Sequence, residues 1–207
     1  LCRDWSSDVC SSDLGLFSNV DSYFGIGLTD SGNVSNTYFY NSAATLFFQL
    51  IGATPIPDDS WIPIFVSWKT NLTAGNKLGN FYAGDVDIGT VFSDSDGSFS
   101  VGYDNQPFFV GRHDFENYNF VGDMAECWFD DSYIDFSVEA NRRLFYSATG
   151  KPVDLGSDGS TPTGSQPIIY LSVRPGDVAA DFATNRGSGG NFTQNGTLAV
   201  ASTSPSD

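Results

Sequence analysis

Short apolar or alternating runs, separated by turns rich in Gly, Asn, Asp, Ser and Pro, follow one another along the chain from Gly15 onward. Because successive side chains of a strand point to opposite faces, such alternation predicts half-buried strands. In the run 61–69, for example, the alternate positions from Ile62 to Trp68 share one face. The spacing of the runs is typical of an all-β protein with two antiparallel sheets packed as a sandwich. The expected strands cover residues 24–28, 37–40, 46–51, 61–69, 78–83, 86–91, 99–103, 108–111, 120–129, 167–171 and 192–200.

Two features interrupt this strand pattern. Pro63 has no backbone N–H, so its strand should lie at a sheet edge or carry a bulge. One short helix is expected between Ser137, a good N-cap residue, and Gly150, which suits a helix end. An acidic residue in its first turn and arginines nearer its end fit the helix dipole.

The first fourteen residues differ in composition from the aromatic, Gly-rich chain that follows, and their apolar positions show neither a strand period nor a helix period. Residues 3–14 resemble the translation of a sequencing adapter, so we set residues 1–14 aside as non-native. Cys2 and Cys10 then leave the cysteine count, and Cys127 is expected to be a small core residue. The alternative is a genuine Cys2/Cys10 disulfide loop.

The composition narrows the class of protein and of partner. The chain has 207 residues, of which 40% are apolar and 16% charged, which is enough for one sizeable core. Its formal net charge of −16 disfavours nucleic acid and anionic membranes as main partners, since both would be repelled. No apolar run approaches the roughly 20 residues that span a bilayer, so membrane insertion is not expected.

Four segments precede the expected helix: 61–67 (WIPIFVS), 81–85 (FYAGD), 108–111 (FFVG) and 120–129 (FVGDMAECWF). Their order, followed by the helix, resembles the concanavalin A-like jelly roll, specifically its laminin-G-like branch. Two later segments, 150–155 (GKPVDL) and 183–187 (ATNRG), are similar to jelly-roll segments of bacteriophage virion proteins. The resemblance implies a single jelly roll over residues 15–201 that is incomplete at its N-terminus. With leading strands missing, residues 17–28 should present an unpaired edge and an exposed apolar groove. Residues 202–207 are expected to form a loose tail.

One loop has the composition of a shallow sugar site, in which an aromatic side chain lies beside polar donors and acceptors. Its alternative role is a polar connection with the aromatic ring packed down. The candidate ligand-binding residues are Arg112, His113, Glu116, Asn117, Tyr118 and Asn119.

A second group of residues has the makeup of a calcium site, because Ca²⁺ prefers carboxylate and carbonyl oxygens from flexible loops. Laminin-G-like and lectin relatives often carry such an ion at the rim, which the resemblance implies for this chain. The alternative is an acidic turn that serves solubility. The candidate metal ligands are Asp94, Asp96, Asp85, Asp87 and Asp104.

Catalytic patterns are weak in this sequence. Glycan hydrolases of the resembled family carry Glu-x-Asp-x-Glu on one strand, whereas this chain has Glu126, Trp128 and Asp130 at those positions. A retaining pair needs its carboxyl groups about 5–5.5 Å apart, and the shorter Asp130 makes that harder to reach. His113 is the only histidine and lies in a polar loop, so a nucleophilic triad has no evident base.

These observations favour a non-enzymatic carbohydrate-binding or adhesion module of a larger phage or bacterial surface protein. Its expected partners are a glycan and other domains of the same protein, and its expected location is a virion or a cell surface. The alternatives are a virion structural domain without a sugar ligand and a divergent glycan hydrolase.

Overall fold

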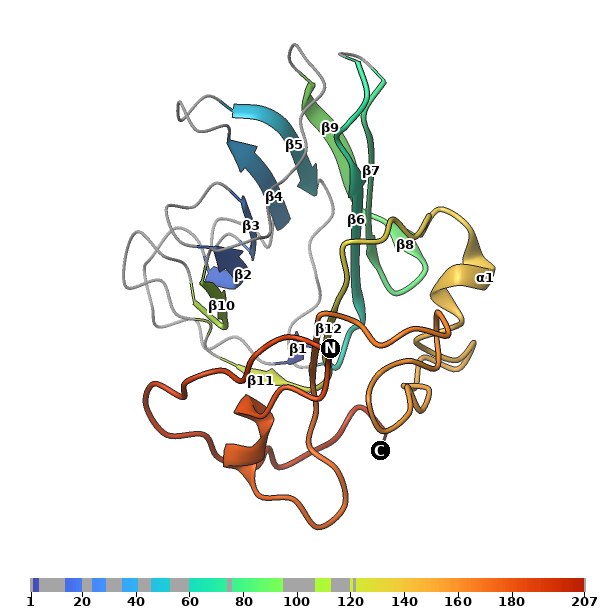
Figure 1. Cartoon of the computed structure of the whole chain (residues 1–207). Helices are drawn as coiled ribbons and strands as arrows, with labels where there is room; N and C mark the ends of the chain where they lie inside the picture. Colours follow the sequence, from blue (N-terminus) through green and yellow to red (C-terminus); the bar gives the residue numbers. More distant parts are fainter. Residues whose placement is uncertain are drawn as a thin grey trace.

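The structure is a computed structural model that describes residues 2–3, 14–19, 24–28, 35–40, 46–52, 60–73, 76–94, 107–112, 120 and 122–206 (Figure 1). Within these residues almost all regular structure is β-strand, and every strand pair is antiparallel. The all-β class predicted from hydrophobic alternation is therefore confirmed.

The largest sheet has six strands. In spatial order they are β10 (Phe108–Val110), β2 (Leu14–Asn19), β3 (Phe24–Leu28), β4 (Ser35–Tyr40), β5 (Leu46–Gly52) and β9 (Gly89–Asp94). β2 and β3 both have neighbours on each side, so the unpaired edge expected at residues 17–28 is wrong. The edges of this sheet are β9 and β10. Within the predicted groove, Ile26 packs against the interior.

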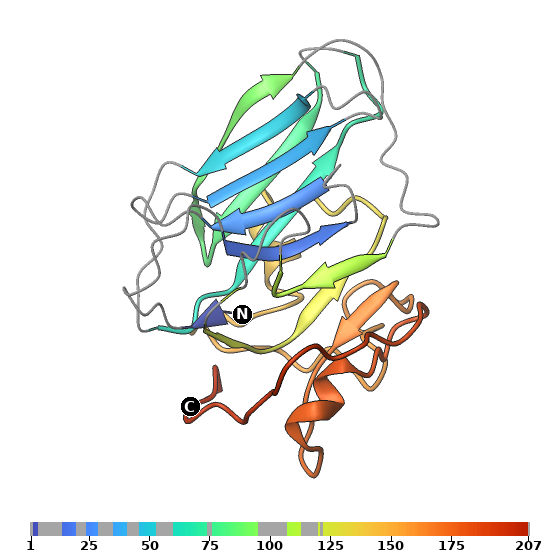
Figure 2. The same ribbon diagram turned by 90° about the vertical axis from the view of Figure 1, so that its left-hand side faces the viewer.

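A three-stranded sheet of β6 (Ile64–Lys69), β7 (Leu78–Ala83) and β8 (Val86–Asp87) faces the larger sheet (Figures 1 and 2). β6 lies at its edge, as Pro63 predicts, and the Pro63 carbonyl accepts a hydrogen bond of 2.8 Å from the Gly84 amide. The two sheets approach closely where β7 crosses β5. A Cβ atom built on Gly79 would lie 2.7 Å from the Leu50 side chain, so any other residue at this position would overlap with it.

Two short strand pairs complete the β-structure. β12 (Cys127–Phe129) pairs with β13 (Ile169–Leu171). The Asn185 side chain supports β13, because it accepts a hydrogen bond from the Tyr170 amide at 2.8 Å and donates one to the Ile168 carbonyl at 3.0 Å. β1 (Cys2–Arg3) pairs with β11 (Asp123–Met124). Residues 4–13 lie outside the described residues, so the non-native origin of the N-terminal segment stays a prediction.

The expected helix is present but much shorter than predicted. α1 covers only Glu139–Arg142, and Val138 rather than Ser137 precedes it. No side chain caps the helix, and the Ser137 hydroxyl donates to Asp135 Oδ1 at 2.6 Å. The only other helical element among the described residues is a 3₁₀ helix, η2 (Ala179–Ala183). Neither is long enough to cross a bilayer.

The C-terminal part differs from the prediction at two places. Residues 192–200 contain no strand, so the final hairpin segment expected there is wrong. Residues 202–206, expected to be loose, are hydrogen-bonded to the body. Trp61 Nε1 donates to Thr203 Oγ1 at 3.1 Å, and Lys151 Nζ donates to the Ser206 carbonyl at 2.8 Å.

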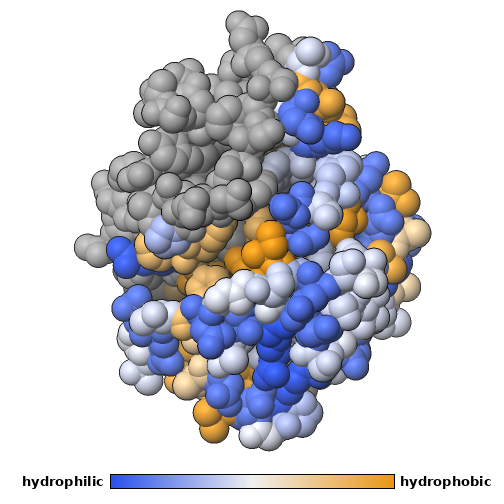
Figure 3. Space-filling model, in the orientation of Figure 1, coloured by the Kyte–Doolittle hydropathy of each residue, from blue (hydrophilic) through white to orange (hydrophobic). Residues whose placement is uncertain are grey.

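Two apolar clusters lie on opposite faces of β6. The main cluster joins the sheets and β12–β13, and its buried members are Phe48, Leu50, Phe81, Ile88, Phe129, Ile169 and Leu171. Ile64, Val66, Trp68 and Cys127 pack against it, which agrees with the predicted apolar face of β6 and the predicted role of Cys127. The aromatic cluster on the other face consists of Phe65, Tyr82, Phe136 and Tyr146. The face of the molecule seen in Figure 3 carries dispersed apolar spots among hydrophilic residues.

Candidate functional site

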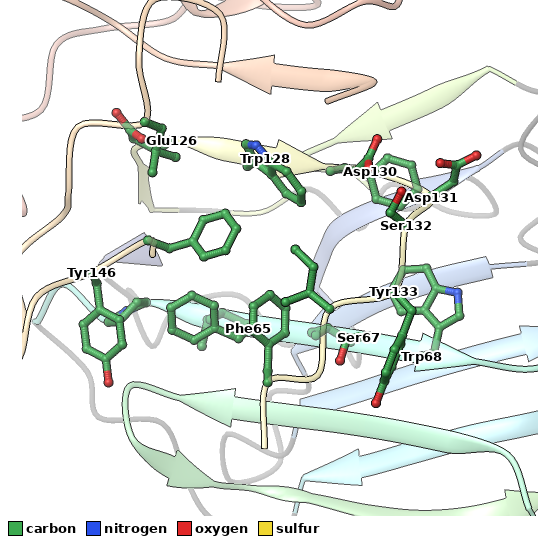
Figure 4. Close-up of a pocket in the computed structure, with 18 of the residues that line it drawn as sticks. Phe65, Ser67, Trp68, Glu126, Trp128, Asp130, Asp131, Ser132, Tyr133 and Tyr146 are labelled. Atoms are coloured by element: carbon green, nitrogen blue, oxygen red, sulfur yellow. The ribbon is translucent and has the colours of Figure 1, made fainter. Parts of the chain in front are cut away.

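A cavity of about 150 Å³ lies between β6, β12 and the segments that follow β12 and α1. Figure 4 shows it in close-up, with β12 on one side and β6 on the other. We call it the β6–β12 cavity. Its lining residues are Pro63 to Trp68, Glu126, Trp128 to Ile134, Phe136, Phe145, Tyr146, Pro152 and Leu155.

Aromatic side chains form the wall of the β6–β12 cavity. The Phe65 ring lies 5.1 Å from that of Phe136 and 5.3 Å from that of Tyr146, centroid to centroid. The Trp128 ring packs edge-on against Phe145 at 5.1 Å. Trp128 Nε1 donates to the Gly159 carbonyl at 2.9 Å, which fixes the orientation of the indole. This wall is therefore preformed, with ring spacings typical of favourable aromatic pairs.

The residues directly after β12 form a polar rim at one end of the cavity. Figure 4 shows Asp130, Asp131 and Ser132 grouped there, near Tyr133 and Trp68. Asp131 and Ser132 are exposed, whereas Asp130 and Tyr133 are partly buried. The Tyr133 hydroxyl accepts a hydrogen bond of 3.1 Å from Asn80 Nδ2, and burial raises the pKa of Tyr133. The rim thus offers carboxylates and hydroxyls beside two aromatic rings.

Glu126 lies at the opposite end of β12 from Asp130 (Figure 4). Its φ of +56° makes it the only described non-glycine residue with a left-handed backbone, so the extended strand starts after it. Burial raises the pKa of Glu126, and the Tyr170 hydroxyl lies 3.4 Å from both carboxylate oxygens. A left-handed residue costs about 1 kcal/mol or more, so the surrounding contacts must hold it in place.

This backbone break changes the interpretation of the hydrolase-like spacing. Glu126, Trp128 and Asp130 would share a face only if all of residues 126–130 were extended. Because Glu126 is left-handed, its side chain departs from that alternation, and the two carboxylates lie at the two ends of β12. The arrangement gives no support to a paired-carboxylate mechanism, which needs both groups at one sugar bond.

The predicted sugar-binding loop falls mostly outside the described residues. His113, Glu116, Asn117, Tyr118 and Asn119 lie there, and only Arg112 is described. Its guanidinium carbon lies 5.1 Å from the centroid of the Phe109 ring, a cation–π distance. The binding role of this loop stays a prediction.

The predicted metal ligands are likewise only partly described. Asp96 and Asp104 lie outside the described residues, and only the backbone of Asp94, at the end of β9, is described. Asp87 Oδ1 accepts from the Gly89 amide at 3.1 Å. Among the described residues, no group of three or more His, Cys, Asp or Glu is arranged to hold a metal ion. Calcium binding remains a prediction.

Asp85, the remaining candidate ligand, is engaged by two arginines from the α1 region. Its carboxylate oxygens lie 3.1 Å from Arg142 Nη2 and 2.7 Å from Arg143 Nη2. The hydrogen bond from Arg143 is the main reason that the pKa of Asp85 lies well below its usual range. Within the described structure, Asp85 therefore fastens the β7–β8 turn to α1.

No family model, no curated protein and no solved structure matches this chain.

Sequence reasoning did not identify the rim as a binding site. It considered Glu126 and Asp130 only as parts of a possible catalytic pattern, and it placed Trp68 on the apolar face of the strand at residues 61–69. A usable signal was present, because the polar run 130–133 (DDSY) directly follows an apolar strand. What the sequence did not reveal is that this run lies across from β6, so that the two segments enclose a cavity.

Proposed function

We propose that this chain is a non-enzymatic carbohydrate-binding module of the jelly-roll type, and that the β6–β12 cavity is its ligand site. Sugars combine apolar C–H faces with a ring of hydroxyl groups. They therefore suit a site with an aromatic wall and a few polar groups at its mouth. The observation that carries the proposal is the polar rim at residues 130–133 beside Trp68.

The rim supports this function because its polar groups are placed to contact a ligand without prior rearrangement. Asp131 and Ser132 are exposed, and no described side chain forms an ion pair with Asp131. Charged hydrogen-bond acceptors bind hydroxyl donors more strongly than neutral acceptors do. The loop 112–119 remains a predicted second contact, and calcium at Asp85, Asp87, Asp94, Asp96 or Asp104 remains a predicted aid to binding.

The wider context of the proposal is adhesion by a larger phage or bacterial surface protein, in a virion or at a cell surface. Two facing antiparallel sheets and an acidic, Gly- and aromatic-rich composition support this context. The resemblance of residues 150–155 and 183–187 to phage virion segments supports it as well.

A glycan array tests the proposal, with the full chain applied in the presence and in the absence of a calcium chelator. We expect binding to at least one glycan, weakened about ten-fold in an Asp131→Ala/Ser132→Ala variant, which corresponds to about 1.4 kcal/mol of lost contacts. Glu139→Ala is the control, because Glu139 is exposed and does not line the cavity. Silence across the array would contradict the proposal and favour a structural role, and so would equal binding by the double variant. The chelator arm tests the calcium prediction separately.

A further inference from the structure

The acidic and basic side chains that line the β6–β12 cavity are all carboxylic acids. Glu126, Asp130 and Asp131 line it, and no Lys, Arg or His is among the lining residues. Elsewhere among the described residues, arginines form ion pairs with Asp85, Glu139, Asp154 and Asp177. Asp130 and Asp131 have no such partner in the described part of the chain. The cavity therefore holds negative charge that the described protein leaves uncompensated.

The position of this charge matters as much as its sign. Asp130 is partly buried at the end of β12, next to the aromatic wall, where the effective dielectric constant is lower than in water. A cation beside this carboxylate is therefore held more strongly than it would be in water. The faces of Trp68 and Tyr133, at the same end of the cavity, also attract cations.

We propose that the cavity prefers a saccharide that carries a free, protonated amine, held by Asp130 and Asp131 at the rim. This inference rests on the proposed carbohydrate-binding function and specifies its ligand class. A protonated amine donates charge-assisted hydrogen bonds to the two carboxylates while the sugar ring lies against the aromatic wall. Saccharides with uronic, sialic or sulfate groups are disfavoured by repulsion, and the net charge of −16 adds to that repulsion at longer range.

The test compares saccharides of different charge. Glucosamine oligomers, N-acetylglucosamine oligomers and uronic acid oligomers of equal length are titrated into the full chain at mildly acidic pH, where the glucosamine amine is protonated. We expect the amine form to bind at least about ten-fold more tightly than the acetylated form, and the uronic form to bind most weakly. Added salt should reduce the difference, because it screens the charges.

The decisive variant is Asp130→Asn/Asp131→Asn, which keeps side-chain shape and removes the charge. It should bind the two glucosamine-based ligands with affinities within about two-fold of each other, because the charge that distinguishes them no longer meets a carboxylate. Glu139→Gln, which removes an exposed charge outside the cavity, should keep the preference. Equal binding of the two ligands by the unmodified chain would overturn this inference and leave the proposed function standing, as would a preference that persists in the double variant. Failure to bind any saccharide, here and on the array, would overturn the proposed function itself.

Discussion

The two faces of β6 show how differently one protein can build its apolar interior. On one face, the main cluster brings together side chains from β5, β7, β12 and β13, and several of them are fully buried. On the other face, the aromatic cluster combines Phe65 of β6 and Tyr82 of β7 with Phe136 and Tyr146 from irregular segments around α1. Strands fill the first face, whereas loops cover the second.

This difference explains where the cavity lies. Strands in register bring apolar side chains together at regular spacing, and interiors built in this way leave few voids. The segments that cover the aromatic cluster have no such regular spacing, and the β6–β12 cavity is lined by Phe65, Phe136 and Tyr146 of that cluster together with Phe129 of the main cluster. Binding sites commonly occur on loops positioned by a rigid scaffold, and β6 serves as that scaffold for the cavity.

The strongest test of this comparison is a pair of truncations, one in each cluster. Phe81→Ala removes a side chain that is 0% exposed and should lower the free energy of unfolding by about 3–5 kcal/mol. Phe136→Ala should lower it by roughly 2–3 kcal/mol, because Phe136 borders an existing cavity and loses fewer contacts. Urea denaturation measures both values. A larger loss for Phe136→Ala would mean that the aromatic cluster, rather than the main cluster, is the better packed of the two.

A second test concerns the polar support of the aromatic cluster. The Arg142 side chain is 7% exposed, and its guanidinium carbon lies 4.3 Å from the centroid of the Tyr82 ring. Arg142→Met keeps the apolar stem but removes the contacts with Tyr82 and Asp85, so we expect a loss of about 1–3 kcal/mol. Thermal and urea unfolding measure the change. Arg143→Met is the matched control and should lose less, since that side chain is more exposed; the reverse order would contradict the role given to Arg142.

Glu126 and Asp85 should give stability opposite dependences on pH. Burial raises the pKa of Glu126, so the native protein keeps the Glu126 carboxyl protonated to a higher pH than the unfolded protein does. The free energy of unfolding should therefore fall as the pH rises from about 4.3, the ordinary glutamate pKa, to the raised native pKa. Arg143 lowers the pKa of Asp85 in the native protein. The ionised Asp85 carboxylate therefore stabilises the fold above about pH 3.9, the ordinary aspartate pKa, and this stabilisation is lost as the pH falls from there to the lowered native pKa.

Glu126→Gln isolates the first of these effects. The variant should be more stable than the unmodified chain at neutral pH, by on the order of 1 kcal/mol or less, and the gain should vanish near pH 4. Unfolding measured across this pH range gives the answer, with Glu139→Gln as an exposed control. A gain that does not vary with pH would show that the charge of Glu126 is not the cause.

The smallest effect is expected outside both clusters. Val200 is 80% exposed and follows the segment that contains no strand, so Val200→Ser should change the free energy of unfolding by no more than about 0.5 kcal/mol. Thermal unfolding of the two proteins side by side checks this. A loss comparable with that of Phe136→Ala would show that the C-terminal segment contributes to the interior after all.

Hydrophobic alternation predicted the strands better than it predicted their ends. The expected strands at 24–28 and 78–83 coincide with β3 and β7. The expected strand at 120–129 is divided into β11 and β12, because Glu126 adopts a left-handed backbone. Glutamate rarely does so, and nothing in its neighbours signals the break.

The site was harder to predict than the fold for a related reason. Period-2 spacing says which face a residue shares, but the β6–β12 cavity joins β6 to segments that follow about 60 or more positions later in the chain. The helix prediction failed locally. The Asp135 side chain accepts a hydrogen bond from the Ser137 amide, and α1 begins only after Val138. Such side-chain-to-backbone bonds offer the chain an alternative to helix and decide boundaries that residue preferences leave open.

Two of the four tryptophans in the sequence, Trp68 and Trp128, line the β6–β12 cavity. Indole emission depends on the polarity around the ring, so the cavity contains its own optical reporter. A saccharide that displaces solvent from it should alter the fluorescence of the unlabelled protein, and saturation of that signal would give an affinity without modification of either partner.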